Sequence, residues 1–161
     1  MTQNSQTLAS GEEARNTSEA FYTALEALLA GRGTEDMSAL WHHADWVSTV
    51  HPLGRWARGW NEVLATWREI AAVFSIYRGH DKRADRIGSP HHLSVEVCGD
   101  TAYSYAVFES CLYMPEGELK LTLNETNILH RFDGQWKVVH HHADQAPAEW
   151  QERIRRMVAA G

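Results

Sequence analysis

Hydrophobic residues recur at helical spacing in four segments of this chain. The first segment begins where Ser10 and Glu13 form a capping box, in which the two side chains satisfy free backbone N–H groups at a helix start. Gly31 and Gly33 end the segment, because glycine tolerates the backbone geometry of a helix C-terminus. The apolar stripe of this helix consists of Phe21, Leu25, Leu28 and Leu29.

The same spacing predicts three more helices. A short one follows Thr34, a long one runs from Gly59 to Gly79, and a terminal one starts at Pro147. Proline suits the first turn of a helix, where its missing N–H is not needed. In order, the three apolar stripes are Met37, Leu40 and Trp41; Trp60, Val63, Leu64, Trp67, Ile70, Ala71, Phe74 and Tyr77; and Trp150, Ile154 and Met157.

Five strands are predicted from runs with strand-like composition and turn residues at their ends. The first covers residues 46–51 and stops at Pro52, which cannot donate a hydrogen bond to a neighbouring strand. The other four cover residues 92–98, 101–113, 118–132 and 135–142, with short turns between them. These four consecutive strands form an antiparallel meander.

Helices segregated from an antiparallel sheet define an α+β protein. We expect a curved antiparallel sheet wrapped around helices to form a cone-shaped barrel with an internal pocket. Such pockets are ligand sites when apolar walls carry a few polar groups. The 161 residues divide into a disordered N-terminus (1–9), a single cone domain (10–146) and a C-terminal helix packed on the domain (147–161).

Composition limits the choice of partner to a small molecule or another protein chain. The net charge of −6 argues against nucleic acid and anionic membranes, because both require clustered Lys and Arg. No apolar run is long enough to span a membrane, and no signal peptide is visible, so we expect a cytoplasmic protein. Cys98 and Cys111 are too far apart in the expected hairpin to form a disulfide.

The densest candidate chemistry lies in the last strand, where His140, His141 and His142 are consecutive. Alternate residues of a strand share a face, so His140 and His142 lie about 7 Å apart on one side and His141 points to the other. Two such imidazoles can hold a proton, bind an anion or ligate a metal. This group is the strongest candidate among the ten histidines.

The turn at residues 133–134 decides which residues lie opposite these histidines. If the turn has two residues, Asn127 lies opposite His140 and Glu125 lies opposite His142.

The alternative is a three-residue loop in which Gly134 takes a bulge position. Thr126 then lies opposite His140, and Asn124 lies opposite His142. We favour this bulged form. It gathers apolar residues on the other face, which a second subunit would cover: Leu119, Leu121, Leu123, Leu129 and Val139.

Further candidates come from the earlier strands and helices. His51 ends a strand immediately before Pro52, where a side chain can reach a cavity rim. Glu109 alternates with Tyr105 and Val107, and a carboxylate on such an apolar face has a raised pKa unless a histidine or arginine pairs with it. The aromatic candidates for ligand contact are Trp41, Trp56 and Tyr77.

Several segments of the chain resemble the SnoaL-like branch of the nuclear transport factor 2-like superfamily. They are Ala-Leu-Trp-His at 39–42, Val-His-Pro-Leu-Gly at 50–54, Arg-Gly-Trp-Asn-Glu-Val at 58–63 and the stretch from Asp133 to His142. The resemblance implies a cone-shaped barrel with a pocket, packed as a homodimer through its sheet. This fold hosts ketosteroid isomerases, polyketide cyclases, dehydratases, association domains and non-catalytic proteins. The histidine run also resembles the iota-class carbonic anhydrases.

Our first hypothesis is an enzyme that isomerises, dehydrates or cyclises a small carbonyl compound by acid–base chemistry, without a bound cofactor. His140 or His142 moves the proton, and Glu109 tunes a histidine. The residues that orient the carbonyl group are Asn124, Thr126 and His51.

Two alternatives remain. One is a ligand-binding or association domain without turnover. The weaker one is a metal-dependent or carbonic-anhydrase-like enzyme, in which three imidazoles from His51, His140 and His142 hold the metal.

Overall fold

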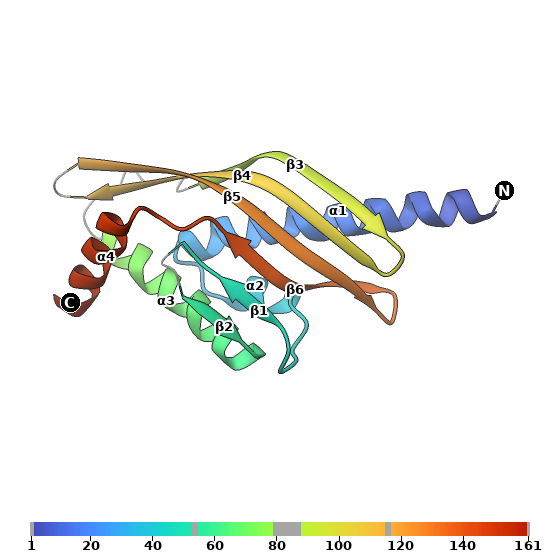
Figure 1. The fold of residues 1–161 in the computed structure, drawn as a ribbon, viewed down its shortest axis with the longest axis horizontal. Coiled ribbons are helices and arrows are strands. Elements are labelled where there is room, and N and C mark those ends of the chain that lie inside the picture. The colour runs from blue at the N-terminus through green and yellow to red at the C-terminus, as the bar shows by residue number, and fades with distance from the viewer. Residues whose placement is uncertain (1, 53–54, 79–87, 115–116, 161) are drawn as a thin grey trace.

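The computed structural model describes residues 2–52, 55–78, 88–114 and 117–160 of the chain, and Figure 1 shows its path. The helices in these residues are α1 (Thr2–Leu29), α2 (Glu35–Leu40), α3 (Trp60–Arg78) and α4 (Ala148–Ala160). The strands are β1 (Ser48–Val50), β2 (Trp56–Arg58), β3 (Gly88–Cys98), β4 (Thr101–Met114), β5 (Gly117–Phe132) and β6 (Gln135–Ala143).

These strands form one sheet in the order β2-β1-β6-β5-β4-β3. Neighbouring strands pair antiparallel, except that β1 and β6 run parallel. The sheet curves over the helices without closing into a complete barrel (Figure 1). The predicted α+β class and the meander from β3 to β6 are therefore confirmed.

Two elements differ from the sequence-based expectation. Helix α1 begins at Thr2, ahead of the predicted start at Ser10, and the Ser10 hydroxyl accepts a hydrogen bond from Arg131 instead of capping a helix. Strand β2 was not predicted, because three residues are too few to show a strand period. It pairs with β1, with Trp56 opposite Val50.

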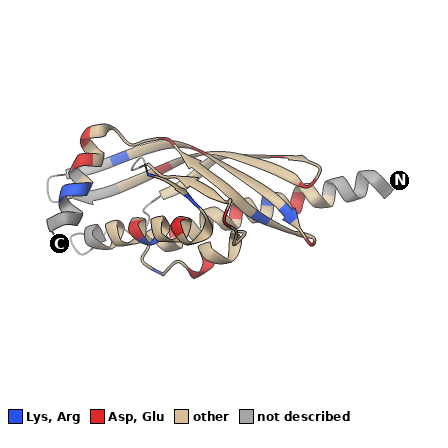
Figure 2. Ribbon diagram, turned by 60° about the horizontal axis from the view of Figure 1, so that its bottom comes forward, with Lys and Arg blue, Asp and Glu red and all other residues tan. Residues whose placement is uncertain are grey.

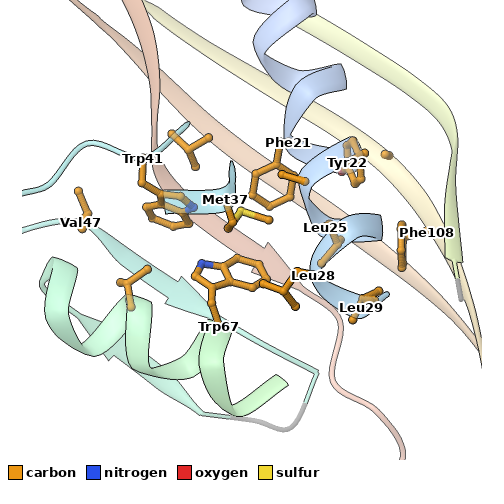
Figure 3. Packing of buried hydrophobic residues seen from close by; sticks show 14 of the residues in the cluster. Phe21, Tyr22, Leu25, Leu28, Leu29, Met37, Trp41, Val47, Trp67 and Phe108 are labelled. Atoms are coloured by element: carbon orange, nitrogen blue, oxygen red, sulfur yellow. The ribbon is translucent and has the colours of Figure 1, made fainter. Parts of the chain in front are cut away.

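The main hydrophobic core lies between the sheet and the first three helices. Figure 3 shows Phe21 of α1, Met37 of α2 and Trp67 of α3 converging with Trp41, which follows α2. The Phe21 and Trp67 rings meet edge to face with centroids 5.9 Å apart, a favourable arrangement for aromatic side chains. This packing holds the helices against the inner face of the sheet and sets the wall of the cavity described below.

The β5–β6 hairpin has a two-residue turn at Asp133 and Gly134. Both residues have positive φ angles, 49° and 82°, as the commonest tight hairpin turn requires. Phe132 pairs with Gln135 across this turn. The three-residue loop that we favoured from sequence is therefore wrong.

A β-bulge interrupts the ladder further along this hairpin. Leu129 pairs with Val138, but the next residue of β5, Ile128, pairs with His140. Val139 is therefore the extra residue of the bulge. Val138 and Val139 are both buried although they are consecutive, so the inward-facing positions shift by one residue at this point.

The bulge reverses the expected orientation of the histidine run. Asn127 pairs with His141, and Thr126 pairs with His142, so neither predicted register holds at the histidines. His141 is buried on the inner face with 1% of its surface exposed. His140 is half-buried and His142 is exposed on the outer face.

The leucines of β5 also face inward, which corrects the expectation that they form an outer surface. Leu123 and Leu129 are buried, and Leu121 contacts the internal cavity. The side chain of Leu119 lies outside the described residues. The outer face instead carries exposed Tyr103, Tyr105 and Ile128.

Figure 2 shows Lys and Arg interspersed with Asp and Glu along the described ribbon. Cys98 and Cys111 do not form a disulfide with each other, as the sequence predicted. Within the described residues, no helix combines the length and apolar character needed to cross a membrane.

Candidate functional site

A cavity of about 70 Å³ lies between the inner face of the sheet and the helices. Most of its wall is apolar and comes from α1, α3, β4 and β5. Ile154 of α4 and Ala146, which precedes that helix, also contact the space. Among the described residues, four bring polar side chains to the wall: His51, Ser110, Glu125 and His141.

His141 reaches this cavity because of the bulge at Val139. Its Nδ1 lies 2.8 Å from Oδ1 of Asn127, the residue opposite it on β5. Its ring packs against Phe21 and Trp67, with centroids 5.2 and 5.3 Å away. Burial lowers the pKa of His141 well below its usual value, and neighbouring histidines add to the effect. The imidazole is therefore neutral near pH 7.

His51 lies directly after β1 and faces the same cavity. Its ring centroid is 5.5 Å from that of His141 and 4.2 Å from that of Trp67. Its Nε2 lies 2.9 Å from the hydroxyl of Thr66, whereas Nδ1 is buried without a hydrogen-bond partner among the described residues. Burial, helped by the positive charge of Arg55, lowers the pKa of His51 to about 3.

Glu125 is a carboxyl group on the inner face of β5, with only 3% of its surface exposed. Burial raises its pKa to about 8; the nearby Tyr22 hydroxyl opposes this rise, and the charge of Asp144 adds to it. The Tyr22 hydroxyl interacts with this carboxyl group, but neither that hydroxyl nor Oε2 of Glu125 has a partner in full hydrogen-bond geometry among the described residues.

Tyr22 responds to the same environment. Its burial and the charge of Glu125 raise the pKa of the hydroxyl far above its usual value, so Tyr22 remains a neutral donor. The candidate site thus combines two neutral imidazoles with a carboxyl group that titrates near neutral pH. A pKa close to the working pH is the property that suits a group for proton transfer.

The structure moves His140 and His142 away from the cavity, contrary to our sequence prediction. His140 Nδ1 lies 2.8 Å from the Ser48 hydroxyl on β1, and His142 is exposed. The two rings lie on the outer face with centroids 6.3 Å apart. The prediction failed because it assumed unbroken alternation along β6, and the bulge breaks that alternation.

Glu109 is also on the outer face, not on an apolar cavity wall. It pairs with Thr122 in the ladder, is exposed, and its carboxylate lies 3.3 Å from His91 Nε2. It does pair with a histidine, as the sequence suggested, but with a surface histidine remote from the candidate chemistry.

Asn124 and Thr126 fall on the same outer face. Asn124 accepts a hydrogen bond from the Tyr105 hydroxyl at 2.6 Å and donates one to Asp144 at 2.6 Å. Thr126 lies opposite His142. These two side chains therefore cannot orient a ligand inside the cavity.

The two aromatic candidates whose side chains are described, Trp41 and Trp56, lie in different parts of the molecule. Trp41 is buried in the core against Trp60 and Trp67 and does not line the cavity. Trp56 is 63% exposed on β2. The side chain of Tyr77 lies outside the described residues. Among the site residues predicted from sequence whose side chains are described, His51 lines the cavity and the others do not.

Sequence reasoning missed Glu125 and His141 as candidate residues. The signal for Glu125 was present, because it lies in an alternating series on β5 with Leu121, Leu123 and Leu129. The signal for His141 was weaker. It consisted of the adjacent Val138 and Val139, which cannot both face the core of a regular strand.

The alternative metal set of His51, His140 and His142 is divided between the two faces of the sheet. His51 lies inside near His141, and the other two lie outside. The described part of the chain contains no group of three or more His, Cys, Asp or Glu side chains placed to hold a metal ion.

The curved sheet, the helices on its inner face and the internal cavity define a cone-fold protein with a candidate small-molecule site. A family model for the SnoaL-like domain matches residues 18–148. The chain therefore belongs to the SnoaL-like domain family.

The F-box protein SKIP8 of Arabidopsis thaliana is 25% identical over 116 residues. This match covers 72% of the present chain and 44% of the plant protein. The chain thus spans less than half the length of this curated relative.

Solved structures include two of comparable sequence similarity. A provisionally assigned dehydratase of the NTF2-like family from Streptomyces avermitilis is 26% identical with a TM-score of 0.65, covering 85% of this chain and 96% of the other. A provisionally assigned calcium/calmodulin-dependent protein kinase type II association domain from Thiobacillus denitrificans is 25% identical with a TM-score of 0.58, covering 81% and 93%. The fold thus accommodates both enzyme-like and association-like relatives.

Proposed function

We propose that this protein is a cofactor-independent acid–base enzyme that acts on a small organic carbonyl compound bound in the internal cavity. The observation that carries the proposal is Glu125, a buried carboxyl group with a pKa of about 8 on a mostly apolar wall. A carboxyl group held this way is a strong base once ionised and an effective acid once protonated.

Glu125 replaces the histidines as the proton-transferring group. A histidine with a pKa of about 3, such as His51, is a weak base, and burial moves the pKa of His141 in the same direction. These neutral rings are suited to accept hydrogen bonds from a ligand. The Ser110 hydroxyl lines the cavity and has no partner among the described residues, so it is available to donate to a carbonyl oxygen.

The reaction follows from these roles. Ionised Glu125 takes a proton from the carbon next to the carbonyl group, and the C–H electron pair moves into a C=C bond while the carbonyl oxygen becomes an enolate. Ser110 stabilises that oxygen by donating a hydrogen bond. Protonated Glu125 then returns the proton either to another carbon, which completes an isomerisation, or to a departing hydroxyl group, which leaves as water.

The similarity to the Streptomyces avermitilis protein supports this choice, since that protein is assigned provisionally as a dehydratase. A screen of small ketones, hydroxy ketones and enones with the purified protein tests it by product analysis. We expect Glu125→Gln to lower kcat/KM by about 10²–10⁴-fold, the usual contribution of general acid–base catalysis. Glu109→Gln, which alters an exposed carboxylate, is the matched control and should leave turnover unchanged. Turnover that survives Glu125→Gln contradicts the assignment.

A non-catalytic association role is the second candidate. It is favoured by the similarity to the Thiobacillus denitrificans association domain and by exposed Tyr103, Tyr105 and Ile128 on the outer face of the sheet. Under this proposal two copies pack through these faces as a homodimer. Light scattering after size-exclusion chromatography should then give twice the chain mass, and Tyr103→Glu should restore the monomer. A monomeric wild-type protein excludes this role.

A further inference from the structure

We infer that the cavity takes an uncharged ligand bearing both a hydroxyl group, which donates a hydrogen bond to Nδ1 of His51, and a carbonyl oxygen. This inference deepens the proposed function, because it names the substrate class for the same cavity. It rests on which atoms of the buried polar side chains already have partners.

The hydrogen bonds of Thr66 fix the tautomer of His51. The Thr66 hydroxyl lies 2.6 Å from the carbonyl oxygen of Val63. A carbonyl oxygen only accepts, so at this separation the single hydroxyl proton of Thr66 must point to it. The Thr66 oxygen also lies 2.9 Å from His51 Nε2. With its proton already used, that oxygen can only accept there, so His51 Nε2 carries the hydrogen. The Thr49 hydroxyl oxygen, 3.3 Å from the same nitrogen, accepts from the same N–H at longer range.

The other nitrogen of His51 is consequently a bare acceptor. In a neutral imidazole one nitrogen donates and the other accepts, so Nδ1 carries a lone pair. This atom is buried and has no hydrogen-bond partner among the described residues, on a side chain that lines the cavity and is 2% exposed. An unpaired buried acceptor costs about 1–3 kcal/mol, and a ligand hydroxyl group would remove that cost.

His141 is oriented by the same logic. Oδ1 of Asn127 accepts from His141 Nδ1 at 2.8 Å, so Nδ1 carries the hydrogen and Nε2 is the acceptor. Both cavity histidines therefore direct their N–H groups toward protein atoms. Neither has a free N–H with which to bind an anion, and at Nδ1 of His51 a ligand must supply the hydrogen.

The wall also lacks fixed charge that would balance an ionic ligand. None of the described lining residues is Lys or Arg. Arg55 is exposed and forms ion pairs with Glu62 and Glu69. Burying an ionised group without a partner is strongly unfavourable, so a carboxylate or phosphate ligand does not suit this space. The Ser110 hydroxyl supplies a hydrogen for the carbonyl oxygen.

Three small probes of similar size, chosen to match a cavity of about 70 Å³, test the inference in wild-type protein at pH 7. They are hydroxyacetone, butanone, in which a methyl group replaces the hydroxyl, and propionate. Binding is followed by quenching of tryptophan fluorescence and by chemical-shift changes in NMR spectra. We expect the hydroxy ketone to bind at least about tenfold tighter than the methyl ketone, and the carboxylate to bind more weakly than both.

The variant His51→Phe keeps a ring but removes the acceptor. We expect it to abolish the preference for hydroxyl over methyl, whereas His142→Phe, on the outer face, should retain it. If His51→Phe does not fold, the ¹⁵N spectrum of histidine-labelled wild type provides the second reading. It should show the unprotonated shift at Nδ1 of His51 and the protonated shift at Nε2.

The inference is overturned by equal affinity for the two ketones, by tightest binding of the carboxylate, by no binding of any probe, or by the opposite tautomer. A preference for the hydroxyl group that depends on His51 supports the inference, even when no product forms. Binding without product formation would mean that the proposed enzymatic function fails while the inferred ligand class stands. The failure of one proposal is therefore distinguishable from the failure of the other.

Discussion

His141 and His142 are neighbours in the chain, yet the two faces of the sheet give them different chemistry. His141 is buried beside Phe21 and Trp67 and is held neutral by its surroundings. His142 is exposed to solvent on the opposite face. The inner face is apolar with a few polar atoms that lack partners, whereas polar groups of the outer face such as His140 and Asn124 are hydrogen-bonded.

This contrast shows that the position of a bulge decides which residue of the histidine run enters the cavity. If Val139 occupied a regular ladder position opposite Ile128, and not the bulge, the ladder would continue unbroken and bring His140 and His142 inside. The composition of the strand would be unchanged. Four changes test the contrast between the faces, and they follow here in order of expected effect.

Introducing a carboxylate on each face should separate the faces most strongly. His141→Asp places a charge on the same cavity wall as Glu125, where no described residue is Lys or Arg, and we expect the free energy of unfolding to fall by more than about 4 kcal/mol. His142→Asp is exposed and should change it by less than about 0.5 kcal/mol. Urea denaturation of both variants measures the difference. Similar losses in the two variants would contradict the assignment of faces.

Neutralising the two glutamates should have opposite consequences for stability and function. Wild-type folding holds Glu125 protonated at a pH where the unfolded chain ionises it. We therefore expect Glu125→Gln to raise the free energy of unfolding by about 2–3 kcal/mol at pH 7 while activity is lost. Glu109→Gln should leave both within experimental error. Denaturation at pH 7 checks this, and a destabilised Glu125→Gln protein would count against a buried protonated carboxyl group.

The pH dependence of stability should have a maximum near pH 6.5. The folded pKa of Glu125 is raised from 4.5 to about 8, so its contribution is complete below pH 4.5 and declines as the pH rises to 8. The folded pKa of His51 is lowered from 6.5 to about 3, so its contribution is complete above pH 6.5 and declines as the pH falls toward 3.

Folding lowers the pKa of His141 as it does that of His51. As the pH falls below 6.5, the two histidines therefore reduce the stability of the fold, and their combined effect exceeds the stabilisation from the single carboxyl group. Above that pH, we expect a fall of about 1.4 kcal/mol per unit until pH 8. Denaturation series from pH 5 to 9 measure both limbs. Glu125→Gln should flatten the alkaline limb and His51→Phe should reduce the acid limb. A wild-type profile that keeps rising from pH 6.5 to 8 would be inconsistent with this account.

The smallest expected effect lies on the outer face. Ser48→Ala removes the hydroxyl partner of His140 and should cost about 0.5–1.5 kcal/mol, the net value of a typical hydrogen bond. It should not alter ligand binding in the cavity. Denaturation combined with the probe titration gives both readings, and a changed probe affinity would connect the outer histidines to the cavity.

Much of the fold was predictable from the sequence because its signals are local. The stripe from Trp60 to Phe74 defined α3, and turn residues such as Gly99 and Gly134 separated the long strands. Strand β2 was missed because it is only three residues long and is formed through pairing with β1. The helical start at Thr2 was missed because residues 2–9 carry no apolar period that distinguishes a helix.

The site was less predictable, because its membership depends on tertiary geometry. His51 was found from its position at a strand end before Pro52. Glu125 was considered only as a possible neighbour of His142, and His141 was assigned to the wrong face. A single bulged residue changes the face of every later residue in a strand, and sequence period alone did not locate it.

The most direct test is the pKa of Glu125, measured by carboxyl ¹³C NMR of glutamate-labelled protein between pH 4 and 10. The resonance is assigned by its absence in Glu125→Gln. Our account predicts a midpoint of about 8, with the carboxyl group protonated at neutral pH. A midpoint near the ordinary value of 4.5 would show an ionised carboxylate at pH 7 and contradict its role as the proton-transferring group of the cavity.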